Sequence, residues 1–427
     1  MKKSTSALVL LFIVVFIDMV GFGIIIPLLP YYGKTFAGDI QAIGHFFGIQ
    51  MSPEGLVIAA LFSVYSLMQL LFSPLWGRLS DRYGRRVILL INMAGTVVSF
   101  VIFGLAGSLL VLFISRIVQG IAGAKIATAQ AYIADVTTSE DRAKGMGLIG
   151  AGLGLGFVFG PAISGILISL EGSILSIRWM QALLHGNIYA LPGYFAAALG
   201  MVNLVLAYFL LPEPERHRSS VNQELYKSRL NASYIKDALS NPRIGLLLLI
   251  LLLATTAFSA MESTFALWGE AALGIHEKMN SYIFAYIGVL IALNQGMIVG
   301  KLARRYGENK LIIIGTSCMG LGLLLIPFSP SITVLLLILI LLAFGSGLNT
   351  PSLQSLISQA SAAEDVGGVM GVSQSAGSLA RIIGPLIGGW MFDLLGIRYP
   401  FFIGAAIMIV AFILSFRLLT SRFQFAT

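Results

Sequence analysis

The sequence predicts an all-α integral membrane protein with twelve transmembrane helices in two pseudo-symmetric six-helix bundles. Its composition is the first reason. Of the 427 residues, 57% are hydrophobic and 11% are charged, with a mean hydropathy of +0.90, whereas a soluble domain carries about 25% charged residues. The second reason is a series of apolar runs of about 20 residues, which is the length that crosses a bilayer. The third is a set of short motifs that recur at one offset.

Each apolar run is expected to be a helix, because backbone groups in lipid must be hydrogen-bonded within their own segment. Short segments of alternating hydrophobicity, which would indicate a membrane barrel, do not occur. The first run is too long for a cleaved signal peptide, and it contains Asp18. The predicted spans are 7–30, 55–76, 87–107, 109–133, 145–168, 190–211, 244–268, 281–299, 311–328, 331–357, 367–391 and 399–419.

The basic residues predict the orientation of the chain. Most of the 27 Lys and Arg residues fall in alternate loops, and Lys and Arg concentrate in cytoplasmic loops of membrane proteins. Both termini are therefore expected in the cytoplasm, and the chain is expected as a multi-pass protein of the cell (inner, cytoplasmic) membrane. This topology also accounts for the net charge of +8, so we expect no nucleic-acid partner.

A repeat divides the predicted bundle into halves. The stretch GRLSDRYGRR at 77–86 is echoed by GKLARRYGEN at 300–309, and GPAISG at 160–165 is echoed by GPLIGG at 384–389. A third echo, of the pair ED and a later Met-Gly, has the same offset of about 224 residues. We therefore expect an N-terminal six-helix bundle at 1–211, a polar cytoplasmic linker at 212–243 and a C-terminal six-helix bundle at 244–427. Two parallel six-helix halves are a transporter plan.

The charged stretch GRLSDRYGRR closely resembles the loop motif of the major facilitator superfamily between its second and third helices. The resemblance implies a conformational latch, in which the aspartate at the position of Asp81 ties the loop to neighbouring helix ends. The second copy has Arg304 at that position, so we expect the first copy to be the functional latch. The stretch YIADVTTSEDRAKG after the fourth span matches the tetracycline-pump pattern. The predicted latch residues are Gly77, Asp81, Arg82, Gly84, Arg85, Asp135 and Arg142.

Two further motifs resemble those of the same superfamily. The fourth span carries RIVQGIAG with Arg116 inside it, and the resemblance implies that this arginine takes part in proton coupling. The fifth span reads GAGLGLGFVFGPAISG and resembles the fifth-helix signature of the antiporter branch, which exports its substrates. Small residues in such a helix allow close helix contact. The predicted antiporter-helix residues are Gly152, Gly156, Gly160, Pro161 and Gly165.

The first span, DMVGFGIIIPLLP from Asp18 to Pro30, resembles the first helix of drug:proton antiporters, and of tetracycline efflux pumps in particular. A carboxyl group inside the membrane is costly when ionised and is by default a functional candidate. A carboxyl that is protonated in one access state and ionised in the other can carry a proton. We therefore predict proton coupling through Asp18, Arg116 and Glu262, with protons as the coupling ion and no cofactor.

The resemblance to tetracycline pumps is weaker at the positions that would determine the transported substrate. The third and ninth spans lack the acidic residues that tetracycline pumps place there. Polar and aromatic side chains inside the spans are the candidate walls of a site for an amphipathic compound. The predicted substrate-binding residues are Asp18, Tyr65, Gln69, Arg116, Gln119, Phe258, Glu262, Gln295 and Asn349.

The expected function is thus a proton-coupled antiporter that exports small amphipathic compounds or drugs by alternating access. Two alternatives stay open: a uniporter or symporter for a sugar, a lipid-like compound or another metabolite, and a transporter-derived receptor. We expect no enzyme. The sequence has no G-x-x-x-x-G-K-[ST] loop, which argues against ATP-driven pumping, and its four histidines form no metal-ligand pattern, so we expect no metal site. We expect a monomer that binds a small-molecule substrate within the lipid bilayer.

Overall fold

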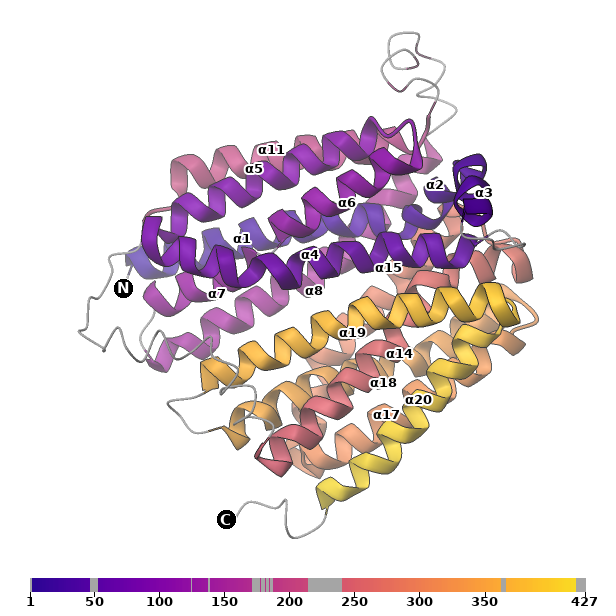
Figure 1. Cartoon of the computed structure of the whole chain (residues 1–427). Helices are drawn as coiled ribbons and strands as arrows, with labels where there is room; N and C mark the ends of the chain where they lie inside the picture. The colour runs from indigo at the N-terminus through magenta and orange to yellow at the C-terminus, as the bar shows by residue number, and fades with distance from the viewer. Residues whose placement is uncertain are drawn as a thin grey trace. The chain divides into compact units, whose positions relative to one another are not determined.

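The computed structural model describes residues 2–46, 53–123, 125–136, 139–170, 177, 181, 184, 187–213, 240–361 and 366–419. Nearly all of these residues lie in helices, and no strand occurs among them (Figure 1). The all-α prediction is confirmed. The chain divides into two compact units, which are described separately.

The first unit comprises residues 1–217 together with Ala266–Gly288. Its helices are α1 (Lys2–Ile25), η1 (Ile26–Leu28), α2 (Leu29–Lys34), α3 (Ala37–Phe46), α4 (Glu54–Tyr83), α5 (Arg85–Gly104), α6 (Leu109–Gly123), α7 (Lys125–Val136), α8 (Ser139–Ser169) and α11 (Ala190–Leu210). Within it α1 packs on α8 and α11, and α5 runs beside α11 (Figure 1).

The second unit comprises residues 218–265 and Val289–Thr427. Its helices are parts of α14 (Pro242–Leu273) and α15 (Glu277–Leu293), followed by η2 (Asn294–Val299), α16 (Gly300–Tyr306), α17 (Glu308–Leu325), η3 (Ile326–Phe328), α18 (Ile332–Ala360), α19 (Val366–Leu395), α20 (Tyr399–Ser415) and η4 (Phe416–Leu419). Helix α17 packs on both α18 and α20. The division between the units runs through α14 and α15, so the 266–288 hairpin belongs to the first unit.

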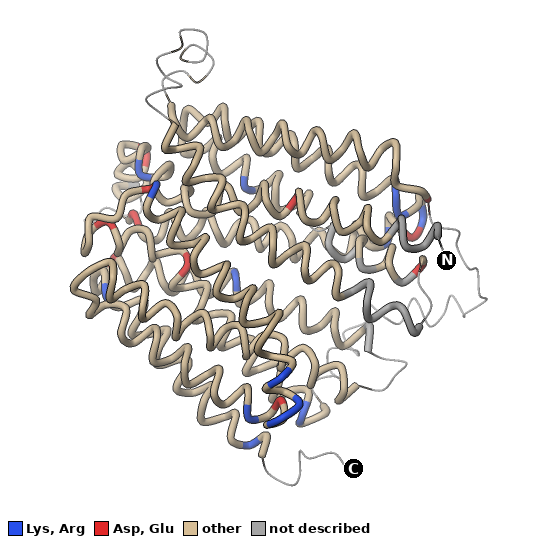
Figure 2. The backbone as a smooth tube through the Cα atoms, turned by 180° about the vertical axis from the view of Figure 1, so that it is seen from behind, with Lys and Arg blue, Asp and Glu red and all other residues tan. Residues whose placement is uncertain are grey.

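Eleven of the described helical segments are long and apolar enough to cross a membrane, and Leu109–Gly123 is a shorter apolar helix. The predicted fourth span, 109–133, falls on α6 and α7, and residue 124 between them lies outside the described residues. Lys and Arg positions lie mostly at helix ends (Figure 2). The predicted linker at 212–243 falls mainly on residues outside the described ranges.

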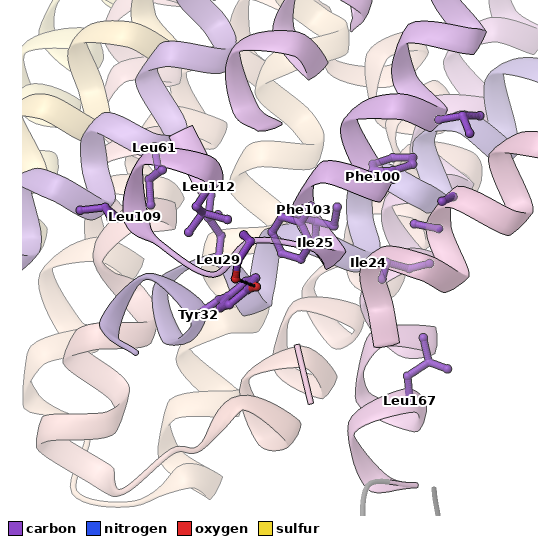
Figure 3. Close-up of a cluster of buried hydrophobic side chains, with 14 of the residues drawn as sticks. Ile24, Ile25, Leu29, Tyr32, Leu61, Phe100, Phe103, Leu109, Leu112 and Leu167 are labelled. Atoms are coloured by element: carbon purple, nitrogen blue, oxygen red, sulfur yellow. Dashed lines mark hydrogen bonds between the residues drawn. The ribbon is translucent and has the colours of Figure 1, made fainter. Parts of the chain in front are cut away.

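A cluster of buried hydrophobic side chains surrounds the point in the first unit where α1 ends and is followed by η1 and α2. Ile24 and Ile25, in the last turn of α1, and Leu29 and Tyr32, in α2, have no exposed surface. They belong to one hydrophobic cluster with Phe103 of α5 and with residues of α4 and α6 (Figure 3). The Tyr32 hydroxyl donates to the Ala106 carbonyl at 2.5 Å, which satisfies the polar end of this side chain inside the apolar cluster.

Candidate functional site

The predicted latch lies where α4 turns into α5. Gly84 joins the two helices with φ of 110°, a conformation that residues other than glycine adopt only at a cost. A Cβ added at Gly84 would lie 2.8 Å from a carboxylate oxygen of Glu213. The turn therefore requires glycine both for its backbone angle and for the approach of Glu213.

Arg85 connects the two carboxylates of the predicted latch. Its Nη1 lies 2.6 Å from Oδ1 of Asp81, and its Nε lies 2.9 Å from Oδ2 of Asp135 in α7. The same Nη1 donates to the Ser80 hydroxyl at 2.6 Å. Because Arg85 is only 8% exposed, these ion pairs are screened less by water than pairs on an open surface. The arginine holds the end of α4, the start of α5 and α7 together.

Glu213 completes this cluster, and the sequence analysis did not identify it. Its carboxylate accepts the backbone N–H groups of Arg85 at 2.7 Å and of Arg86 at 3.1 Å. These are unpaired donors at the beginning of α5, where a negative charge is stabilised by the helix dipole. Arg86 in turn donates to the carbonyl of Tyr208 in α11. In the sequence Glu213 lies just after the sixth predicted span. No local pattern there predicts that its carboxylate accepts the first N–H groups of α5.

Within the described residues, neither Gly77 nor Arg82 adds an ion pair to this cluster, although the Gly77 carbonyl accepts from the Ser80 hydroxyl at 2.7 Å. Gly77 has open space where a Cβ would stand. Arg82 is exposed, with its guanidinium carbon 5.3 Å from the centre of the Tyr83 ring. Arg142 lies in α8, but its side chain is outside the described part of the structure.

A small pocket inside the first unit contains Asp18, which is half-buried in α1. The pocket has roughly the space that one water molecule requires. Its lining residues are Asp18, Met19, Phe22, Tyr65, Thr96, Phe100, Gln119 and Gly123. Asp18, Tyr65 and Gln119, three of the predicted substrate-binding residues, therefore come together from α1, α4 and α6.

Arg116 lies beside this pocket and is 1% exposed. Its guanidinium carbon is 5.1 Å from the centre of the Tyr65 ring and 5.9 Å from that of Phe22, so aromatic faces stabilise the buried charge. Nη1 of Arg116 donates to the Gln119 side-chain oxygen. Nε of Arg116 has no hydrogen-bond partner among the described residues.

Gln69 fixes the neighbouring helix contact. Its amide donates to the Gly123 carbonyl at 3.0 Å, and Gly123 itself lines the pocket. Gly120 faces the backbone carbonyl of Tyr65, so a side chain there would collide with α4. The close contact of α4 with α6 thus places Tyr65 against Arg116.

The glycines of α8 lie against α1, the helix that carries Asp18. A Cβ added at Gly156 would lie 2.5 Å from Cβ of Met19, the residue after Asp18, and one at Gly160 would lie 2.6 Å from Cα of Gly23. Gly152 faces the backbone of Phe12. Pro161 stands inside α8, and its Cδ approaches Gly23. The two helices therefore approach nearly to backbone contact, as small residues allow in membranes.

Gly165 makes a different contact. A Cβ added there would lie 2.8 Å from the ring of Tyr282, in the 266–288 hairpin. The Ser169 hydroxyl, one turn further along α8, is 3.3 Å from the Tyr282 hydroxyl. The end of the predicted antiporter helix thus packs on the hairpin rather than on α1.

In the second unit, α14 and α19 repeat the α1–α8 contact. Gly384 and Gly388 of the echoed GPLIGG motif approach the backbone of Thr256 and of Ala260 in α14. Glu262 lies further along α14 and is half-buried. Its carboxyl group interacts electrostatically with Arg381 of α19. Phe258 is half-buried one turn before Glu262. The recurring sequence motif therefore produces a recurring helix pair, each carrying an intramembrane carboxylate on its first helix.

Gln295 and Asn349 do not join these charged groups in the second unit. Gln295 is exposed in the π-helical segment η2. Asn349 of α18 is 1% exposed, and its amide lies 3.7 Å from the sulfur of Met319 in α17. Its contacts indicate helix packing.

The 266–288 hairpin is fixed to the first unit by three polar contacts that the sequence analysis missed. The buried Asn280 amide donates to the carbonyl of Pro27 at 2.8 Å, and the Tyr31 hydroxyl donates to the carbonyl of Ile275 at 2.8 Å. Lys34 forms an ion pair with Glu270 at 2.9 Å. We call these three contacts the hairpin cluster.

The model of the family described as Major Facilitator Superfamily matches residues 11–317 and 296–423. The chain is 32% identical to the class C tetracycline resistance protein of Escherichia coli, over 90% of this chain and 89% of that protein. It is 30% identical to multidrug resistance protein 2 of Bacillus subtilis, over 96% and 95% of the two chains. A D-xylose–proton symporter shares the fold, with a TM-score of 0.74 at 15% identity over 97% of each chain.

Proposed function

We propose that this chain, which belongs to the major facilitator superfamily, exports small amphipathic compounds in exchange for protons by alternating access. The observation that carries the proposal is the pocket in which Asp18 lies with Tyr65 and Gln119, next to the buried Arg116. Similarity to tetracycline and multidrug resistance proteins supports the same direction of transport.

In this proposal Asp18 carries the proton. An ionised carboxylate inside the membrane is costly, so the group gains a proton when its partner cation is lost and releases it when a cation approaches. A cationic part of the cargo competes with the proton for the same carboxylate. Such competition makes the two movements alternate, which is the requirement for exchange.

Arg116 keeps the local charge balanced while Asp18 titrates. Its charge is fixed because arginine does not lose its proton in proteins, and the rings of Phe22 and Tyr65 hold it in place. The Nε–H group of Arg116, which has no hydrogen-bond partner among the described residues, can donate to a further acceptor. We propose that Arg116 stabilises the ionised form of the pocket rather than carrying the proton.

The number of titrating carboxylates determines what the pump can achieve. One proton that moves down about 100 mV releases roughly 2.3 kcal/mol, and one pH unit adds about 1.4 kcal/mol. For a neutral cargo these together sustain a gradient of a few hundred-fold. For a monovalent cation exchanged one for one the potential cancels, and about tenfold per pH unit remains. Glu262 in the second unit would supply a second proton site.

The charge distribution supports an orientation with both termini in the cytoplasm of a cell whose inner membrane holds the protein. We propose a monomer, because each unit brings its own carboxylate-bearing helix pair. In this orientation the latch around Arg85 lies at the cytoplasmic ends of its helices and the hairpin cluster at the opposite ends. Export then requires the hairpin cluster to open when cargo leaves.

A uniporter or symporter for a sugar or another metabolite remains the second candidate. The specific observation in its favour is that α5 has no acidic residue and α17 has only Glu308, in its first turn, unlike the tetracycline-pump pattern. The D-xylose–proton symporter shares the fold only.

Reconstitution in liposomes distinguishes the candidates. The purified protein is placed in vesicles with a pH-sensitive dye inside and an imposed proton gradient, and tetracyclines, cationic dyes and sugars are added in turn. Proton movement triggered by a drug supports the antiporter. A sugar that equilibrates with no proton movement, while no drug has an effect, supports a facilitator and overturns the proposal.

A further inference from the structure

The repeated loops of the two halves have the same turn but different charge environments. Gly84 and Gly307 both adopt left-handed angles, with φ of 110° and 80°. In the first copy Arg85 is buried between Asp81 and Asp135. In the second copy Glu308 stands at the position of Arg85, and Arg304 at that of Asp81. The second loop therefore cannot form the same ion-pair cluster.

Four cations of this second loop are exposed. They are Lys301, Arg304, Arg305 and Lys310. Among the described residues none of them forms an ion pair with a carboxylate. The nearby Glu308 instead accepts hydrogen bonds from Ser355 at 2.5 Å and from Gln359 at 2.9 Å. Figure 2 shows basic positions gathered in this part of the second unit, next to the C-terminal segment.

Aromatic side chains accompany these cations. Tyr306 is 44% exposed, and the guanidinium carbon of Arg305 lies 5.3 Å from the centre of its ring. Asn309 donates to the carbonyl of Leu418 at 3.1 Å, which holds η4 beside the start of α17, and Phe416 of η4 is 47% exposed. Tyr side chains are enriched at the membrane–water interface, so the exposed Tyr306 is consistent with that position.

We propose that the basic loop formed by Lys301, Arg304, Arg305 and Lys310 binds the headgroups of anionic phospholipids at the membrane surface. Clusters of four or more Lys and Arg residues directly beside a transmembrane helix attract anionic lipids. Lys301, Arg304 and Arg305 stand in α16 and Lys310 stands in the first turn of α17. These are the adjoining ends of two candidate membrane-spanning segments, so the cations are expected at headgroup depth. The first loop uses its charge within the protein, and the second presents its charge to lipid.

Native mass spectrometry of the full chain in detergent tests the proposal, with phosphatidylglycerol and phosphatidylcholine as probes. The chain is expected to retain phosphatidylglycerol in preference. The double variant Lys301→Gln/Lys310→Gln should weaken this retention by about thirtyfold. The matched control Lys278→Gln/Arg398→Gln removes two exposed cations elsewhere and should retain the lipid like the wild type.

Three outcomes would overturn the proposal. The first is equal retention of the two lipids by the wild type. The second is equal loss in the loop variant and in the control, because general charge would then explain the effect. The third is complete displacement of the lipid by inorganic phosphate at equal concentration, which would indicate a site for a free anion. All variants are first compared with the wild type in thermal unfolding, and Arg304→Gln/Arg305→Gln provides a second pair if the lysine variant is unstable.

Discussion

Nε of Arg85 lies 2.9 Å from Oδ2 of Asp135, joining residues that are 50 positions apart in the chain. The same guanidinium also contacts Asp81 at 2.6 Å. Removing the arginine leaves two partly buried carboxylates without their cation, which costs more than losing an exposed pair. This arginine is thus the centre of the predicted latch, whereas the sequence motif had drawn attention to Asp81.

The variant Arg85→Gln is expected to slow transport turnover several-fold with little change in equilibrium substrate binding, because the pair stabilises one access state. Turnover in liposomes and binding by fluorescence titration provide the two measurements. Arg78→Gln, which removes an exposed charge from the same stretch, is the matched control. A large loss of affinity at normal turnover would refute the latch.

The variant Glu213→Gln is expected to loosen the first turn of α5. The carboxylate accepts the N–H groups of Arg85 and Arg86, and loss of such a cap costs about 1 kcal/mol. Hydrogen–deuterium exchange of these amides should accelerate about fivefold while exchange in the middle of α5 stays constant. Unchanged exchange at both amides would mean that Glu213 does not cap the helix.

The variant Gly160→Ala is expected to destabilise the protein by about 1 to 3 kcal/mol, because the new methyl would meet the backbone of Gly23. Gly154→Ala is the matched control on the same helix, since nothing lies within 4 Å of its added Cβ. Thermal unfolding in detergent compares the two. Equal stability of both variants would contradict the close α1–α8 contact.

The variant Asn280→Ala is expected to open the hairpin cluster, because it removes the buried hydrogen bond to the Pro27 carbonyl. In a Cys318→Ser background, which removes the single cysteine, a cysteine placed at the buried Ile275 reports accessibility to a membrane-impermeant maleimide. Labelling should accelerate several-fold. Met279→Ala, at an exposed neighbouring position, should leave the rate unchanged. Slow labelling in both variants would show that the Asn280 bond does not hold the cluster closed.

The sequence predicted the helices well because apolar length alone determines them in a membrane. It also predicted close packing at GPAISG, where small residues recur. It could not predict that Asn280 reaches Pro27, which is 253 residues away, or that Glu213 caps α5, because neither contact has a local pattern.

The grouping of candidate residues was likewise only partly predictable. Asp18, Tyr65 and Gln119 meet in one pocket, although their spacing in the sequence does not say so. Gln295 and Asn349 were chosen because they are polar residues inside spans, but one is exposed and the other packs between helices. A polar residue inside a predicted span is a candidate for substrate binding. The face of the helix on which it lies determines which groups it contacts.

Drug-driven proton movement in liposomes that contain the Asp18→Asn variant tests the central claim most directly. The wild type and Glu54→Gln, which removes a carboxylate at the start of α4 outside the pocket, serve as controls. A transported drug is expected to trigger proton movement in both controls and none in Asp18→Asn, although that variant folds like the wild type. Proton-coupled export by Asp18→Asn at the wild-type rate would contradict the claim, because Asp18 could not then be the proton carrier.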